Sequence, residues 1–173
     1  MPLDAAAEAF CASEYPRLVR ALTLYVGDVH LAEELAQEAL LRACRDWSRV
    51  GQLDSPGGWA WHVARNLAAS HFRRARAARR AHRRLEGETG RFHHDPETTD
   101  VVALRRAAAA LPERQRHALV LRHVLDLTVD DTAARMGISA DAVKALSKRA
   151  TAALRQELGL PQPTLDREAR DAR

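Results

Sequence analysis

The sequence predicts an all-α fold built from two small helical domains. Ala, Leu, Arg and Glu dominate the chain, and these residues favour helices, whereas aromatic residues make up only 5% of it. Apolar residues recur at three- and four-residue spacing, with almost no strand-like alternation. The helical patterns fall into two regions on either side of a charged stretch, and 173 residues leave room for two small domains.

The first domain is predicted over residues 5–80. Residues 10–14 are expected to end one helix, and Pro16 suits the first turn of the next. That next helix presents Leu18, Leu22 and Tyr25 on one face and stops near Gly27. We therefore expect a helix boundary at the proline.

A further helix is predicted over residues 28–47, and Ser55-Pro56 is expected to start another that runs toward Arg80. In the first of these, Leu31, Leu35 and Cys44 are expected to face inward. Its outward face is predicted to carry Glu33, Glu34, Glu38 and Arg42. Ser55 is a good N-cap residue and proline is favoured at the first helical position, which explains the second start.

Residues 81–99 are predicted to be a flexible linker, because this stretch has too few apolar residues to bury a core of its own. The second domain is expected over residues 100–158, followed by a polar tail over residues 159–173. About 20 flexible residues reach far enough to hold two domains on separate parts of a long ligand.

The second domain contains helix-turn-helix spacing over residues 127–144. Thr128 is expected to cap a short helix, Gly137 to supply the turn and Ser139 to cap the next helix. Ile138 and Val143 are expected to face the core. An ordinary αα-hairpin would show similar spacing, but Lys144, Lys148 and Arg155 add a basic stripe suited to phosphate.

A run of arginines in the first domain predicts a second surface that binds a polyanion. No acidic residue lies between Asp54 and Glu86, and like charges at helical spacing repel unless something neutralises them. Trp59 and Trp61 lie beside this run, and each has two interpretations: a core side chain, or a ring available for base stacking.

Several classes of function are disfavoured by the sequence. It has no Gly-rich phosphate loop, no HExxH motif and no nucleophile beside a base, so we expect neither an enzyme nor a cofactor. His93-His94 lack partner spacing for a metal. Cys11 and Cys44 are predicted to be buried reduced thiols, not a disulfide. Without a signal peptide or an apolar span, a cytoplasmic protein without membrane insertion is expected.

Three segments resemble conserved blocks of the extracytoplasmic-function sigma factors, a group of the sigma-70 family. Residues 32–43 (AEELAQEALLRA) resemble their polymerase-binding helix. Residues 59–74, which include Ala64-Arg65-Asn66-Leu67, resemble the helix that melts and reads the minus-ten element. Residues 111–122 resemble the entry to the domain that reads the minus-thirty-five element, and the order and spacing of all three segments match the family.

The resemblance implies sigma region 2 over residues 5–80, sigma region 4 over residues 100–158, and three sets of contacts. The clamp helices of the largest subunit of core RNA polymerase would contact Glu33, Glu34, Gln37, Glu38 and Leu41. Minus-ten promoter DNA would contact the loop from Gly51 to Ser55, and Trp59, Arg65, Asn66, Ser70, Arg73, Arg74 and Arg76. Minus-thirty-five promoter DNA would contact Ser139, Asp141, Lys144, Lys148 and Arg149. An anti-sigma factor is a further partner class, although no residue here identifies one.

Two departures from the family pattern affect the DNA contacts. Ser70 stands where the family usually has Asp, so one polar contact is changed. The recognition helix usually has the sequence VKSRL, but here residues 143–147 are VKALS, which lacks the arginine and shifts the leucine by one position. The alternative function is an autonomous helix-turn-helix regulator that never binds polymerase, and it would leave the segment from Glu33 to Leu41 without a role.

Overall fold

A computed structural model describes residues 4–82 and 99–161 of the chain. These residues form eight helices and no strand, which confirms the predicted all-α class. They belong to two compact units, one on each side of the predicted linker, and each unit is described by itself. Residues 83–98 of the predicted linker and residues 162–173 of the predicted tail lie outside the described residues, whereas residues 81, 82 and 99 belong to helices.

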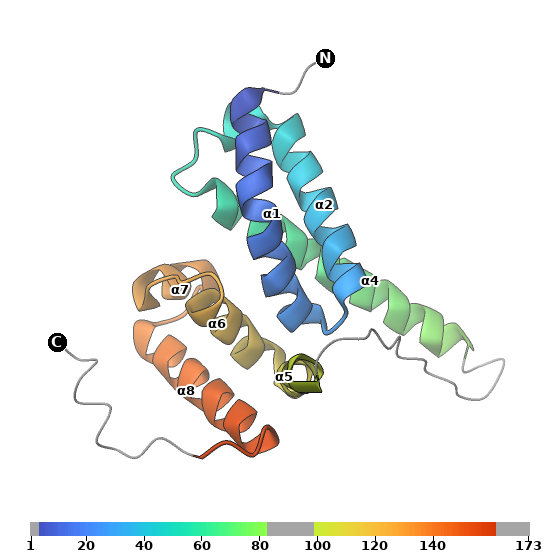
Figure 1. Ribbon diagram of the computed structural model, residues 1–173, viewed down its shortest axis with the longest axis vertical. Helices are drawn as coiled ribbons and strands as arrows, with labels where there is room; N and C mark the ends of the chain where they lie inside the picture. Colours follow the sequence, from blue (N-terminus) through green and yellow to red (C-terminus); the bar gives the residue numbers. More distant parts are fainter. Residues whose placement is uncertain (1–3, 83–98, 162–173) are drawn as a thin grey trace. The chain divides into compact units, whose positions relative to one another are not determined.

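The first unit is built on two packed helices, α1 (Ala5–Val26) and α2 (Val29–Arg45), shown in blue in Figure 1. Gly27 ends α1 in the left-handed region, at φ 82°, and Asp28 caps α2 by accepting a hydrogen bond from the backbone N–H of Leu31. A left-handed C-terminal residue is the usual place for glycine. The predicted stop at Gly27 is therefore confirmed.

The boundary expected at Pro16 is wrong, because α1 continues through the proline without interruption. Proline lacks the N–H that would donate to the carbonyl of residue 12, so its place inside a helix is locally unfavourable. Burial outweighs that cost: Leu18, Leu22 and Tyr25 are all buried, as predicted. Packing of the apolar face against α2 keeps α1 in one piece.

A short helix α3 (Trp47–Val50) and the long helix α4 (Pro56–His82) complete the first unit. The helix predicted over residues 28–47 therefore ends two residues early, at Arg45. The hydroxyl of Ser55 accepts a hydrogen bond from the N–H of Gly58, so the predicted cap of α4 is confirmed. Side chains of α4 are described only up to Ala78.

Alanines let these helices pack closely. On α2 the fully buried face consists largely of Ala32, Ala36, Ala39 and Ala43, and on α4 of Ala60, Ala64 and Ala68. Leu35 joins this face of α2, as predicted, whereas Leu31 and Cys44 are only half-buried. Because the first half of α4 packs on α2 and α1, its second half extends beyond them, as Figure 1 shows in green.

The second unit contains α5 (Thr99–Ala110), α6 (Glu113–His123), α7 (Val129–Met136) and α8 (Ala140–Glu157). α8 packs against the other three, and its buried side chains Val143 and Ala150 face a core that includes Leu111, Leu119 and Leu121. The pair α7 and α8, joined by the turn at Gly137, is the predicted helix-turn-helix.

The turn of the helix-turn-helix confirms most of the predicted capping. Gly137 has φ 64°, and the N–H of Ile138 donates to the carbonyl of Ala133. The hydroxyl of Thr128 accepts from the N–H of Asp131 and donates to its carboxylate, so the two residues cap α7 together. Ile138 is half-buried, short of the core position expected for it, because the turn leaves it at the edge of the unit.

Candidate functional surfaces

The exposed surface of α2 gathers the five residues predicted to bind polymerase, which we call the acidic face: Glu33, Glu34, Gln37, Glu38 and Leu41. Four of them are exposed and Glu33 is half-buried. Leu41 is 62% exposed, the largest value among the exposed large apolar side chains of the described residues. Acidic groups followed along the helix by one exposed leucine form a surface that combines charge with an apolar contact.

The charges of the acidic face have weak local partners. The Arg42 Nε lies 2.7 Å from Glu38 Oε1, and the His30 Nδ1 lies 3.9 Å from Glu33 Oε2. Exposed pairs at this helical spacing contribute only about 0.3–0.5 kcal/mol. A basic surface of a partner could therefore replace these ion pairs at little cost in free energy.

The arginine face of α4 consists of Arg65, Asn66, Ser70, Arg73, Arg74 and Arg76. Arg73, Arg74 and Arg76 are exposed, as is Asn66, whereas Arg65 and Ser70 are half-buried. The three exposed arginines lie in the second half of α4, next in sequence to Phe72, which is 39% exposed. Guanidinium groups and an exposed ring together suit contacts to phosphates and to unstacked bases.

Hydrogen bonds within α4 orient part of the arginine face. The Arg73 Nη2 donates to the Ser70 hydroxyl at 2.9 Å, and Asn66 Nδ2 lies 2.9 Å from His62 Nε2. The serine that departs from the family pattern thus still makes a polar contact, as an acceptor for arginine. A neutral hydroxyl holds the guanidinium less strongly than a carboxylate would.

The tryptophans of α4 have different environments. Trp61 is only 3% exposed and meets Tyr25 edge-on, with 5.6 Å between ring centroids, so it is a core side chain. Trp59 is half-buried, and the Arg49 guanidinium lies 5.8 Å from its ring centroid. Sequence reasoning missed Arg49, because only the fold brings α3 to the start of α4. This cation–π pair lies next to the loop from Gly51 to Ser55.

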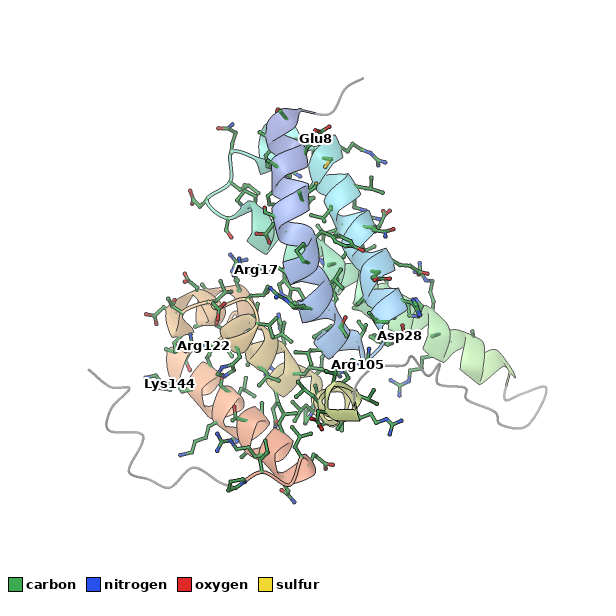
Figure 2. All side chains as sticks on the ribbon, in the orientation of Figure 1. Glu8, Arg17, Asp28, Arg105, Arg122 and Lys144 are labelled. Atoms are coloured by element: carbon green, nitrogen blue, oxygen red, sulfur yellow. The ribbon has the colours of Figure 1, made fainter. Side chains whose placement is uncertain are left out.

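Four of the five residues predicted for the minus-thirty-five element lie on the outer surface of α8, and the fifth, Ser139, caps the helix. Asp141, Lys144, Lys148 and Arg149 are exposed along the helix, and Figure 2 shows the Lys144 side chain on α8. The Lys144 Nζ lies 3.5 Å from an oxygen of Asp141. Ser139 has a structural role as well, because its hydroxyl accepts a hydrogen bond from the N–H of Ala142. Arg155 donates to the carbonyl of Pro161 instead of extending the basic stripe freely.

The unusual sequence of the recognition helix changes how α8 packs at residues 146 and 147. The Ser147 hydroxyl is buried and has no hydrogen-bond partner among the described residues. Leu146 beside it is only half-buried. A serine where the family has leucine therefore replaces apolar packing with an unsatisfied polar atom, while Lys144 keeps its exposed position.

Over residues 4–82 and 99–161, no three His, Cys, Asp or Glu side chains gather to hold a metal ion. None of the described helices is long and apolar enough to span a membrane. His93 and His94 lie outside the described residues.

Comparison with protein families assigns each unit to a known domain. Residues 10–78 match Sigma-70 region 2, and residues 102–154 match Sigma-70, region 4. The acidic and arginine faces lie in the first match, and the exposed surface of α8 lies in the second. Among solved structures, the sigma factor RpoE of Bartonella quintana, crystallised with the anti-sigma factor NepR, is similar in fold: the TM-score is 0.71 at 20% identity, over 90% of this chain and 98% of that one.

Individual relatives agree with the family match. The ECF RNA polymerase sigma factor SigC of Mycobacterium tuberculosis is 33% identical over 132 residues, which cover 75% of this chain and 71% of the relative. The RNA polymerase sigma-E factor of Streptomyces coelicolor is 28% identical over 167 residues, covering 95% of this chain and 94% of the relative. With both sigma domains in order and relatives of this kind, the chain belongs to the extracytoplasmic-function sigma factors of the sigma-70 family, which are transcription initiation factors and not enzymes.

Proposed function

We propose that this sigma factor acts through three surfaces. The acidic face docks on the clamp helices of the largest polymerase subunit, and the arginine face opens and holds the minus-ten element. The outer surface of α8 reads the minus-thirty-five element. In this proposal residues 5–80 act as region 2, 81–99 as a linker, 100–158 as region 4 and 159–173 as a polar tail. The protein acts in the cytoplasm, where its polymerase partner is.

The observation that carries the docking proposal is the exposure of Leu41 at the C-terminal end of the acidic face. An isolated surface leucine is ordinary, but this one is 62% exposed and follows Gln37 and Glu38 by one turn, on a helix whose opposite side forms the core. Covering that leucine while pairing the carboxylates with basic groups would combine apolar burial with electrostatic steering. An autonomous DNA-binding regulator has no use for such a face, since it repels phosphate.

Strand opening needs no chemistry by this subunit. A protein that binds single-stranded DNA better than the duplex shifts the equilibrium toward the open form by that difference in affinity. Arg73, Arg74 and Arg76 supply the electrostatic part, and Trp59 with Phe72 supplies rings on which bases can stack. The unstacking of a flipped base costs a few kcal/mol, which several such contacts offset.

The double reversal Glu34→Lys/Glu38→Lys tests the docking proposal. Both side chains are exposed, so the variant should keep its far-UV dichroism, while binding to immobilised core polymerase should weaken by about tenfold or more. Leu41→Ala should also weaken binding, through lost apolar contact. Run-off transcription should fall in parallel, and duplex binding by region 4 should survive.

Glu8→Lys/Glu157→Lys is a matched control, because it makes the same change in net charge at two exposed positions outside the acidic face. Leu160→Ala is the control for Leu41→Ala, since Leu160 is 53% exposed. Both controls should bind core polymerase as the unchanged protein does. Undiminished core binding by a folded Glu34→Lys/Glu38→Lys variant would contradict the docking proposal and leave the autonomous regulator as the better description.

A further inference from the structure

The two cysteines of the chain meet between α1 and α2. Cys11 Sγ lies 2.8 Å from Cys44 Sγ, although 33 positions separate the residues in the sequence. Both thiols are free and half-buried, and no other cysteine is present. The sequence predicted two separate buried thiols; the packing of α1 against α2 instead places them in direct contact. Neither residue belongs to the acidic or the arginine face.

We propose that Cys11 and Cys44 form a reversible dithiol–disulfide site, whose disulfide covalently links α1 to α2. A disulfide requires the two sulfur atoms to approach from side chains already aimed at each other, and this condition is met by two helices held together by a shared core. The disulfide can therefore form while the first unit stays folded. The proposal does not depend on how the chain contacts polymerase or DNA.

A small-molecule disulfide such as oxidised glutathione is the co-reactant. The thiolate of one cysteine attacks a glutathione sulfur, which forms a mixed disulfide and expels one glutathione thiolate. The second cysteine then attacks the protein sulfur of that mixed disulfide, which forms the Cys11–Cys44 bond and expels the second glutathione. The two protons lost by the cysteines end on the two glutathione thiols. An excess of reduced thiol reverses both steps.

The environment of Cys11 sets the pH dependence of this exchange. Burial, followed by the hydrogen bond and charge of Cys44, raises the pKa of Cys11 to about 12. Only a thiolate attacks a disulfide, so the step that uses Cys11 is slow at neutral pH and accelerates as the pH rises. We therefore expect the disulfide to form slowly. Its amount should follow the sustained ratio of oxidised to reduced thiol, and a brief exposure to oxidant should form little of it.

The disulfide should stabilise region 2. It closes a loop between residues 33 positions apart and so restricts the unfolded chain, while the folded helices stay where they are. A disulfide over a loop of this size should raise the Tm of a small domain by about 10 °C or more. A bond that could form only after unfolding would strain the folded state and lower the Tm instead.

The full-length protein should be equilibrated, without oxygen, in buffers of increasing oxidised-to-reduced glutathione ratio, blocked with N-ethylmaleimide and analysed by mass spectrometry. The expected product is a monomer lighter by two hydrogens, with the peptides containing Cys11 and Cys44 linked, and dithiothreitol restores the dithiol. Its Tm should exceed that of the reduced form. Formation should be faster at pH 9 than at pH 7.

Cys11→Ser and Cys44→Ser are the matched controls, and each should form only a mixed disulfide with glutathione and show no rise in Tm. Cys11→Ala and Cys44→Ala replace them if either serine variant loses its helical dichroism. Three results would overturn the proposal: both thiols still labelled after equilibration in the most oxidised buffer, a disulfide only between two chains, or an intramolecular disulfide that leaves the Tm unchanged or lowered.

Discussion

At the scale of single residues, two serines of α8, one at its N-terminus and one in its middle, have opposite effects on the stability of the helix. Ser139 lies at the N-terminus, where its hydroxyl satisfies the backbone N–H of Ala142. Ser147 lies in the middle of the helix, where its buried hydroxyl has no partner among the described residues. A buried polar atom costs free energy unless it is hydrogen-bonded. The same residue type thus stabilises the helix at one position and destabilises it at the other.

Ser139→Ala and Ser147→Ala should therefore change the stability of region 4 in different directions. Loss of the cap should lower the free energy of unfolding by about 1 kcal/mol. Removal of the unsatisfied hydroxyl should leave that free energy unchanged or raise it by up to about 1 kcal/mol. Urea unfolding of the full chain, followed by circular dichroism, measures both. If Ser147→Ala is as damaging as Ser139→Ala, the Ser147 hydroxyl has a partner that the structure does not show.

At the scale of elements, α4 combines two functions along one helix. Its first half is a core element, with Ala60, Trp61, Ala64 and Ala68 buried, and its second half carries the exposed arginines. Because α4 is one continuous helix, packing of its first half sets the direction in which the exposed arginines of its second half are presented. The hydrogen bond from Arg73 to Ser70 further limits the freedom of one guanidinium.

Arg73→Ala/Arg74→Ala should reduce the formation of open promoter complexes by about tenfold or more while core-polymerase binding stays near normal, because the arginine face is separate from the acidic face. Permanganate footprinting reports strand opening, and a pull-down reports core binding. Arg106→Ala/Arg114→Ala removes the same charge from two exposed positions of the second unit and should open promoters normally. Lost core binding in the first variant would mean that the arginine face contacts polymerase.

At the scale of the whole molecule, function depends on two units with separate cores. Each unit buries its own apolar residues, around Leu22 and Trp61 in the first and around Leu121 and Val143 in the second. Residues 83–98 between them lie outside the described part of the chain. Their composition predicts a connection that works by its reach and not by packing.

Scrambling residues 87–98 at constant composition should leave run-off transcription within a few-fold of normal, because end-to-end reach depends on length and composition more than on order. The urea midpoints of both units should not change. A scrambled chain that stays folded but loses transcription would show that this segment makes a specific contact in the transcription complex.

The sequence determined the fold class, the caps and turns at Gly27, Ser55 and Gly137, and the family, because these depend on short-range patterns of apolar periodicity and local hydrogen bonds. It also predicted the exposed residues of α2 and α8, apart from Glu33, which is half-buried. Which of those exposed residues touch polymerase or promoter remains a prediction, since exposure is necessary for contact but does not establish it.

The tertiary structure alone decided the rest, because it depends on which distant segments meet. Burial of Leu18, Leu22 and Tyr25 against α2 carries α1 through Pro16, although the local preference of proline favours a break. The fold separates the core Trp61 from the half-buried Trp59 and brings Arg49 to the latter. It also brings Cys11 into contact with Cys44, a pair that no local spacing predicts, because their proximity arises from the packing of two helices.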